Sequence, residues 1–430
     1  MLLLSVYRLL TWLALPVALA YHWYRSVSRG RKSAFAERLG WLPSDLRSIS
    51  REKPVIWLHA VSVGEVIAAR PLLQGLRDRY PGHQLLLSVT TETGRGVAER
   101  DQLADRVIYF PFDIGPAVRR VLDSVQPRVV IIMETEIWPL FTQEASQRGI
   151  PLLLANGRIS DRSSVRYRRL AWFFRPVLTR FTCLGMQTDL DRERIIAAGA
   201  PAERSQVLGN LKYDIPCGPV AVEQRLELRR QYAMAADNLV FTAASTHSGE
   251  EQAVLAAWRE LAEQYPEARL VLVPRHPERS AEVARLVEQF GFKARRRTEL
   301  TVDRLLAADE LLLVDTVGEL TNIYRLSDVV FVGGSLVPSG GHNLLEPAAC
   351  GVASLFGPHM NNFKEVAALA LQYGAGVQVA DAAELQGALN DFLVSSELRQ
   401  VIGANGLKMM RTAGGATQRY LDALDQVLSP

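Results

Sequence analysis

Short apolar runs rich in β-branched residues alternate with segments of helical periodicity along most of the chain. A pair of parallel strands needs a long crossover, usually a helix, so this alternation is typical of parallel sheets covered by helices. The predicted strands cover residues 55–60, 84–89, 106–110, 128–133, 151–155 and 181–187, then 239–244, 269–273, 310–314, 328–332 and 352–356. The sequence therefore predicts an α/β fold built from two series of strands.

The segment YDIPCGPV, residues 213–220, separates the two series and has no periodicity. Because 430 residues suffice for two domains of ordinary size, we predict Rossmann-like domains over residues 31–215 and 216–430. Residues 1–30 are predicted to form a membrane anchor, for the reasons given below. Ligands of open parallel sheets bind at the carboxyl ends of the strands. Residues that carry chemistry are therefore expected directly after strands.

Residues 2–24 are apolar apart from Arg8 and a few small polar groups. As a helix they would extend about 34 Å, enough to span a bilayer core of about 30 Å. Basic residues between positions 25 and 32 follow, and the positive-inside rule then places the rest of the chain in the cytoplasm. One alternative is a signal peptide that ends near Ala20, although its positive charge would then lie on the wrong side of the apolar run. Another is an interfacial helix, because Arg8 and Pro16 weaken insertion.

The charges of the chain almost cancel, with 49 basic and 46 acidic residues, so no global field favours nucleic acid. The segment 157–180 is a local exception, with seven arginines and one aspartate among aromatic residues. We interpret it as a surface for the membrane or for an anionic amphipathic ligand, and a solvated helical face is the alternative. Cys183, Cys217 and Cys350 are too widely spaced to predict a zinc site or a disulfide framework.

Three strand-to-helix joints share a hydroxyl residue, a glycine and a glutamate. They are Ser62-Val-Gly-Glu65, Ser248-Gly-Glu-Glu251 and Thr316-Val-Gly-Glu319. Each is explained either as a capping box, in which the hydroxyl and the glutamate satisfy backbone N–H groups, or as part of a ligand site. The pattern alone does not choose between these interpretations.

The segment FVGGSLVPSGGHNLLEPAACG, residues 331–351, has two glycine pairs after a predicted strand and Pro347 in a first helical turn. Such a loop can present backbone N–H groups to a phosphate, and Glu346 would accept hydrogen bonds from ribose hydroxyls. It lacks the Lys-Ser/Thr ending of a P-loop. The alternative is a flexible glycine-rich turn with an ordinary cap.

Other polar residues also follow predicted strands. Arg275 and His276 offer donors that suit a phosphate or a nucleobase edge, unless they belong to a solvated loop. Glu134 and Glu136 follow another strand, and Lys212 is a plausible partner for a carboxylate at that edge.

The sequence Asp189-Leu190-Asp191 matches the D-x-D pattern of metal-dependent sugar transferases. Its position at the start of a predicted helix favours capping over metal binding. We predict no metal and no cofactor.

Taken together, these residues resemble one family, the 3-deoxy-D-manno-octulosonic acid (Kdo) transferases of lipopolysaccharide biosynthesis. The motifs that carry the resemblance are HAVSVGE, METEIWP, NGRIS, GNLKYD, ASTHSGEE, LVPRHPER, DTVGEL, FVGGSLVPSGGHNLLEP and FGPHMNNFKE, which run nearly end to end. The resemblance implies a GT-B fold with two facing domains, CMP-Kdo as donor and a lipid A precursor, lipid IVA, as acceptor. It also implies an N-terminal anchor in the cell inner membrane, with the catalytic domains in the cytoplasm.

The motifs also assign roles to residues. The resemblance makes Glu65 the general base and makes Glu134 and Lys212 the groups that stabilise the transition state. It implies that the first domain binds the acceptor and that the second holds CMP through Arg275, His276, Val317, Gly318, Glu319, Asn343, Leu344, Leu345 and Glu346. The chain departs from the family pattern at Leu345 and Gly157, and neither departure removes a functional group.

The proposed chemistry is a direct inverting displacement without a covalent enzyme intermediate. A carboxylate base accelerates attack by a hydroxyl about a hundred- to ten-thousandfold. A helix N-terminus normally lowers the pKa of a carboxylate such as Glu65, which weakens it as a base. Burial by a bound lipid would offset this lowering. Two rival functions are a nucleotide-sugar epimerase or hydrolase on the same plan, and a membrane-tethered nucleotide sensor in which Glu65 is only a cap.

Overall fold

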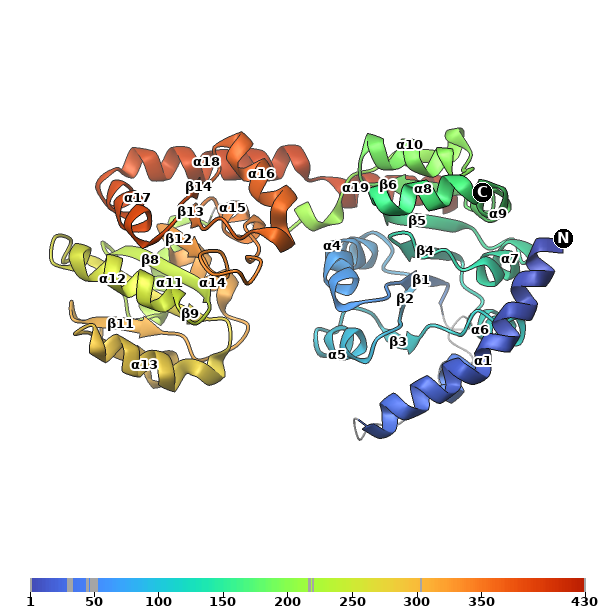
Figure 1. Cartoon of the computed structure of the whole chain (residues 1–430), viewed down its shortest axis with the longest axis horizontal. Coiled ribbons are helices and arrows are strands. Elements are labelled where there is room, and N and C mark those ends of the chain that lie inside the picture. The colour runs from blue at the N-terminus through green and yellow to red at the C-terminus, as the bar shows by residue number, and fades with distance from the viewer. Residues whose placement is uncertain are drawn as a thin grey trace. The chain divides into compact units, whose positions relative to one another are not determined.

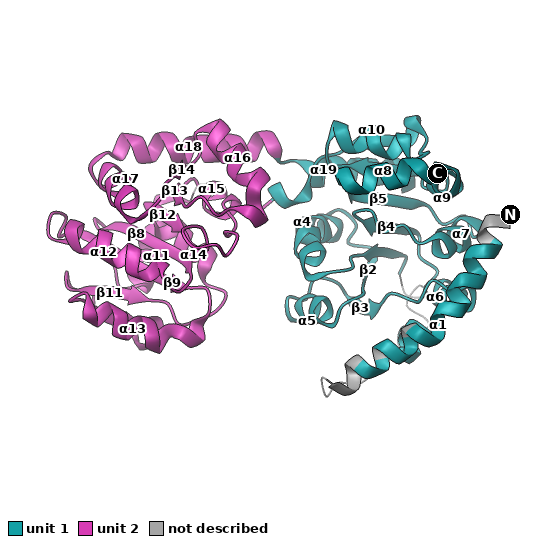
Figure 2. Cartoon of the chain, in the orientation of Figure 1, with its two compact units in different colours: residues 1–214, 414–430 teal, residues 215–413 magenta. Residues whose placement is uncertain are grey.

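The computed structural model describes residues 2–28, 34–43, 46, 53–215, 218, 220–301 and 304–428 (Figure 1). The chain divides into two compact units, coloured in Figure 2. Unit 1 contains residues 1–214 and 414–430, and unit 2 contains residues 215–413. Each unit is built around its own parallel sheet.

The sheet of unit 1 has seven parallel strands in the order β3-β2-β1-β4-β5-β6-β7. Its strands are β1 (Val55–His59), β2 (Gln84–Val89), β3 (Arg106–Tyr109), β4 (Val129–Met133), β5 (Leu152–Gly157), β6 (Cys183–Met186) and β7 (Ser205–Val207). The helices of unit 1 are α1 (Leu2–Ser28), α2 (Phe35–Arg38), α4 (Val63–Arg79), α5 (Glu92–Arg100), α6 (Gly115–Val125), α7 (Pro139–Gln147), α8 (Asp161–Arg169), α9 (Ala171–Leu178), α10 (Asp189–Ala197), η2 (Ala202–Arg204), η3 (Leu211–Tyr213) and α19 (Ala416–Leu428). Strands β1 and β4 are buried along their whole length, as expected for a sheet covered on both faces.

Unit 2 contains a second sheet of seven parallel strands, in the order β10-β11-β9-β8-β12-β13-β14. Its strands are β8 (Leu239–Thr246), β9 (Ala268–Pro274), β10 (Lys293–Arg296), β11 (Glu310–Leu313), β12 (Val329–Val332), β13 (Ala353–Phe356) and β14 (Val377–Gln378). The helices of unit 2 are α11 (Val222–Gln231), α12 (Glu250–Ala262), η4 (Pro277–Arg279), α13 (Ser280–Gln289), η5 (Arg297–Glu299), α14 (Leu320–Leu326), α15 (Leu345–Ala349), η6 (Asn361–Phe363), α16 (Lys364–Tyr373), α17 (Ala382–Val394) and α18 (Ser396–Ala413).

The predicted α/β class is confirmed, and every predicted strand forms. Strands β7, β10 and β14 were not predicted, because they are short and lack an apolar run; β10, for example, reads KARR. Each of them lies at or next to the edge of its sheet, where less of the strand needs to be buried.

The C-terminal residues 414–430 belong to unit 1, whereas the sequence assigned all of 216–430 to the second domain. Helix α19 packs on α4 and buries Tyr420, Leu421 and Leu424 in the core of unit 1. The burial of these side chains is the physical reason for the difference, since an amphipathic helix can complete either core and its sequence does not state which one.

Helix α1 covers the predicted anchor, residues 2–24. In the described part of the chain, no helix combines the length and the apolarity needed to cross a membrane. Several apolar side chains of α1 are nevertheless exposed, among them Leu9, Leu13 and Trp23. Of the basic residues that predict the orientation, Arg25 lies in α1, and Arg29, Arg31 and Lys32 lie outside the described residues.

Candidate active site

The predicted site residues gather at the carboxyl ends of the strands in both sheets. In a doubly wound sheet, ligands bind beside the strands where the strand order reverses. In unit 1 these strands are β1 and β4, and Glu65 and Glu134 follow them. In unit 2 the corresponding strands are β8 and β12, which are followed by His247 and by the glycine-rich loop.

Glu65 lies in the first turn of α4 and is only 8% exposed. Its Oε2 accepts a hydrogen bond from the backbone N–H of Val61 (2.8 Å) and its Oε1 accepts one from the hydroxyl of Ser62 (3.2 Å). Ser62 Oγ in turn accepts the N–H of Glu65, so the capping interpretation is correct. Burial raises the pKa of Glu65, and these hydrogen bonds and the negative charge of Glu136 modify it further. The expected lowering by the helix terminus does not prevail, because the protein itself buries the carboxylate.

Glu134 directly follows β4 and lies in the left-handed region, with φ of +52°. A residue other than glycine rarely adopts this conformation, and such strain is often stored at functional sites. Burial raises the pKa of Glu134, as does the charge of Glu65, whereas the charges of Arg158 and Lys212 oppose this increase. The charge of Lys212 therefore acts on the Glu134 carboxylate.

Glu136 completes a group of three carboxylates, Glu65, Glu134 and Glu136, that we call the acidic edge. Burial raises the pKa of Glu136, and the charge of Glu134 raises it again. Each member of the acidic edge thus favours holding a proton more than an isolated glutamate does. The sequence places Glu136 after the same strand as Glu134 but does not indicate a role for it.

The three similar joints differ in the partners of their glutamates. Glu251 pairs with Arg279 (2.8 Å). Glu319 pairs with Arg297 (2.8 Å) and accepts the hydroxyl of Tyr232 (2.6 Å). Among the described residues Glu65 has no ion pair. Unlike Glu251 and Glu319, Glu65 therefore keeps its carboxylate without a cationic partner in the described part of the chain. Glu250, beside Glu251, also lacks a cationic partner, but its carboxylate accepts four backbone N–H groups.

The glycine-rich loop after β12 is fastened by Glu250, which is fully buried. Its carboxylate accepts the backbone N–H groups of Gly334 (2.7 Å), Ser335 (2.9 Å) and Leu336 (2.9 Å). It also accepts the N–H of His247 (2.9 Å). These amides, which the sequence suggested for a phosphate, are thus already satisfied by the protein.

Imidazole groups lie beside the same loop. The Nε2 atoms of His247 and His342 are 2.9 Å apart and the two rings stack. The ring of His276 lies edge-on to that of His247, with centroids 6.1 Å apart. Burial, together with the charges of His247, Arg275 and His276, lowers the pKa of His342 to about 4. We call His247, Arg275, His276 and His342 the basic edge.

The remaining predicted CMP ligands follow β9, β11 and β12. Arg275 and His276 are exposed after β9, and Val317 is 82% exposed after β11. Burial raises the pKa of Glu319, but hydrogen bonds from Thr316, Tyr232 and Arg297 lower it below the ordinary value.

The loop that leads into α15 offers fewer side chains than predicted. Asn343 accepts the N–H of Leu345 (3.1 Å) and donates to Glu346 (3.1 Å). The side chains of Leu344 and Leu345 are buried in the core of unit 2, so only their backbone groups are available to a ligand.

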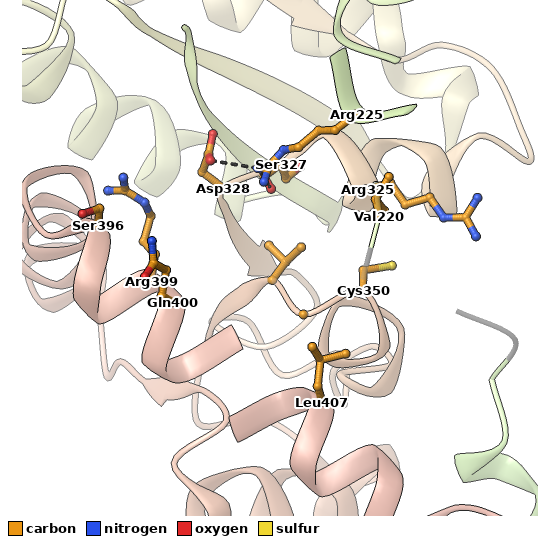
Figure 3. A pocket seen from close by; sticks show the side chains of 12 residues that line it. Val220, Arg225, Arg325, Ser327, Asp328, Cys350, Ser396, Arg399, Gln400 and Leu407 are labelled. Atoms are coloured by element: carbon orange, nitrogen blue, oxygen red, sulfur yellow. Dashed lines mark hydrogen bonds and ion pairs between the residues drawn. The ribbon is translucent and has the colours of Figure 1, made fainter. Parts of the chain in front are cut away.

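A cavity of about 280 Å³ in unit 2 lies away from these residues. It is bordered by Asp328 and Val352, which precede β12 and β13, and therefore lies at the amino ends of the strands. Figure 3 shows Arg225 reaching across to Asp328, and the bond measures 2.8 Å. Because the predicted site residues follow the carboxyl ends of the strands, we assign this cavity no part in the site.

The Asp189-Leu190-Asp191 motif opens α10, as predicted. Thr188 caps the helix, and Asp191 accepts the backbone N–H of Ile159 (2.8 Å). In the part of the chain that the structure describes, no group of three or more His, Cys, Asp or Glu residues is arranged to hold a metal ion.

Comparison with known proteins identifies the family. The family model described as 3-deoxy-D-manno-octulosonic-acid transferase (kdotransferase) matches residues 33–215. A 3-deoxy-D-manno-octulosonic acid transferase from Haemophilus influenzae is 36% identical over 380 residues, covering 87% of this chain and 87% of the relative. The chain belongs to the Kdo transferase family. Another member, from Bordetella pertussis, is 34% identical over 384 residues with the same coverage of both chains.

Solved structures share the fold. A putative UDP-N-acetylglucosamine 2-epimerase from Listeria monocytogenes aligns with a TM-score of 0.55 and 16% identity, covering 87% of this chain and 96% of that chain. At this identity the likeness concerns the fold alone. The predicted GT-B class, with two Rossmann-like sheets, is confirmed.

Proposed function

We propose that this family member transfers Kdo from CMP-Kdo to the lipid A precursor lipid IVA by a direct inverting displacement. The observation that carries the proposal is the contrast between Glu65 and the two similar glutamates, because Glu65 is buried without an ion pair among the described residues. A carboxylate in that state is suited to take a proton from a hydroxyl nucleophile.

The acidic edge is proposed to supply the general base, Glu65, and the neighbouring carboxylates that affect its pKa. In the proposed reaction, the acceptor hydroxyl attacks C2 of Kdo while its proton passes to Glu65. The bond between C2 and the CMP phosphate oxygen breaks, and the electron pair leaves with CMP. Lys212 and Glu134, which interact electrostatically, would balance the charge that develops on the sugar.

The basic edge is proposed to receive CMP. Arg275 and His276 are exposed beyond β9 and offer donors to the phosphate. Because Glu250 occupies the first amides of the glycine-rich loop, the phosphate would depend mainly on these side chains. Glu319, held ionised by its partners, and Glu346 would accept hydrogen bonds from the nucleoside. This proposal calls on no metal for charge stabilisation.

Unit 1 is proposed to rest against the inner membrane, with its sheet on the cytoplasmic side. The ring of Tyr7 in α1 lies 6.1 Å from that of Phe173 in α9, so exposed apolar side chains of α1 adjoin those of α9, including Trp172. Helix α8 adds exposed arginines, among them Arg166 and Arg169. Apolar groups flanked by arginine suit an anionic lipid surface.

The test is to incubate the purified protein with CMP-Kdo and lipid IVA and to analyse the lipid by mass spectrometry. The proposal predicts a mass increase equal to one or more Kdo residues and CMP release that depends on lipid IVA. Release of CMP without the lipid would indicate a hydrolase or epimerase. Binding of CMP-Kdo without turnover would indicate a sensor.

A further inference from the structure

The loop that carries Lys212 is fastened by the C-terminal helix α19, which belongs to unit 1 (Figure 2). Arg419 Nε donates to the carbonyl of Leu208 (2.8 Å). Asp214 accepts the backbone N–H of Gly415 (2.6 Å) and also that of Thr417. Contacts on both sides of Lys212 therefore tie its loop to the start of α19.

Tyr420 makes the most deeply buried of these contacts, being 1% exposed. Its hydroxyl accepts the N–H of Asn156 (2.7 Å), and it faces the carbonyls of Gly185 (3.1 Å) and Gly209 (3.2 Å). A hydroxyl has one hydrogen, which these two carbonyls share. A side chain at Gly185 would place its Cβ 2.4 Å from the Tyr420 ring, so the site is shaped around this tyrosine.

Asn156 connects Tyr420 to the turn that contains Lys212. It is the penultimate residue of β5 and has φ of +58°, a left-handed conformation that asparagine tolerates better than most residues. Its Oδ1 accepts the N–H of Leu211 (3.0 Å), directly before Lys212. Gln187 braces the same group by donating to the carbonyl of Asn156 (3.0 Å) and accepting from Asn210 (2.8 Å).

The last link is the backbone of Lys212, whose N–H donates to Asn210 Oδ1 (3.0 Å). A path of hydrogen bonds thus runs from Tyr420 through Asn156 to the turn that presents Lys212. We propose that Tyr420 is a positioning residue for Lys212 and that α19 is part of the catalytic apparatus. This inference rests on the proposed function, because it assumes that Lys212 acts in the transfer.

The test variant is Tyr420→Phe, which keeps the packed ring and removes only the hydroxyl. A small displacement of a catalytic group can cost about a hundredfold in rate, so we expect kcat to fall about ten- to a hundredfold. The KM for CMP-Kdo should not change, because Tyr420 acts through the transition state. The matched control is Tyr80→Phe, which removes another hydroxyl that binds α19, through Asp425, away from the Asn156 path. This control should keep the wild-type kcat.

A double-mutant cycle separates positioning from general damage. In the Lys212→Ala background, Tyr420→Phe should cause no further loss of the residual rate, since the group that it positions is gone. An equal loss in both backgrounds, or a wild-type rate for Tyr420→Phe alone, would overturn the inference. If Tyr420→Phe does not fold, Asn156→Gly decides in its place, because glycine accepts the same φ and lacks the Oδ1 that holds Leu211. Asn156→Gly should then show the same dependence on Lys212, and a wild-type kcat would overturn the inference.

The outcomes also separate this inference from the proposed function. A slow Lys212→Ala variant with a normal Tyr420→Phe variant would refute only the positioning role. A Lys212→Ala variant with the wild-type rate would refute the role of Lys212 in the proposed function, and the inference with it.

Discussion

The acidic edge of unit 1 and the basic edge of unit 2 occupy equivalent positions on similar sheets, yet their chemistry is opposite. In unit 1, Glu65 is buried, Glu134 and Glu136 are partly buried, and the charges of these carboxylates raise one another's pKa. In unit 2, Glu250 and Glu251 are satisfied by backbone amides and by Arg279, and the groups left facing outward are Arg275 and imidazoles. This contrast is the basis for proposing a proton acceptor in unit 1 and an anion site in unit 2.

The largest effect among the tests of this comparison is expected from Glu65→Gln. If the unpaired carboxylate is the base, kcat should fall about a hundred- to ten-thousandfold while CMP-Kdo binding stays near normal, because glutamine keeps the shape and loses the basicity. Transfer to lipid IVA and calorimetric binding of CMP-Kdo measure the two effects. The matched control is Glu92→Gln, which alters the first-turn glutamate of α5 and should keep the wild-type rate. A Glu65→Gln variant that retains a tenth of the wild-type rate would exclude this role.

The second test addresses the basic edge through Arg275→Ala. Loss of a charged hydrogen bond costs about 1.5–3 kcal/mol, so the Kd for CMP should rise about ten- to a hundredfold. Arg285→Ala on α13 removes the same charge from an exposed position of unit 2 and serves as the control. Titration calorimetry measures both variants. Equal affinities for the two would show that Arg275 does not contact the nucleotide.

A smaller effect is expected from Glu136→Gln on the pH dependence of transfer. A base works when deprotonated, so the rate falls as the pH drops through the pKa of Glu65, which burial and Glu136 raise. Removing the charge of Glu136 makes ionised Glu65 more stable and lowers its pKa. The acid limb of the kcat profile should therefore move to lower pH. An acid limb that does not move would show that the charge of Glu136 does not affect the pKa of Glu65.

The smallest expected effect is proton uptake by His342. Burial and neighbouring cations lower its pKa to about 4, so it is neutral near pH 7. A bound phosphate would stabilise the charged imidazole and raise this pKa, so binding near pH 5–6 should take up part of a proton. Calorimetry of CMP binding in buffers of different ionisation enthalpy measures the uptake. The difference in proton uptake between the wild type and His342→Asn separates the proton bound by His342 from any proton bound by the phosphate. Equal uptake by the two proteins would contradict the prediction.

The sequence predicted the sheets well because burial on both faces demands long apolar strands, such as VVIIM in β4. It also placed Glu65, Glu134 and Arg275 correctly after strands. It also suggested Lys212 as a partner of the carboxylates, but it missed other contacts between distant parts of the chain. The His247–His342 contact joins residues 95 positions apart, and the contact of Asn156 with Tyr420 spans 264 positions. No local pattern reports such pairs, and the amphipathic sequence of α19 does not state which core it completes.

The return of α19 to unit 1 has a consequence for synthesis of the protein. A ribosome makes residues 414–430 only after it has made all of unit 2. Domains generally fold as they emerge, but the first Rossmann-like unit must wait for its last helix while the second one folds. Until then the apolar surface that receives Leu421 and Leu424 stays open, so translation that stops early leaves the first unit without its closing helix.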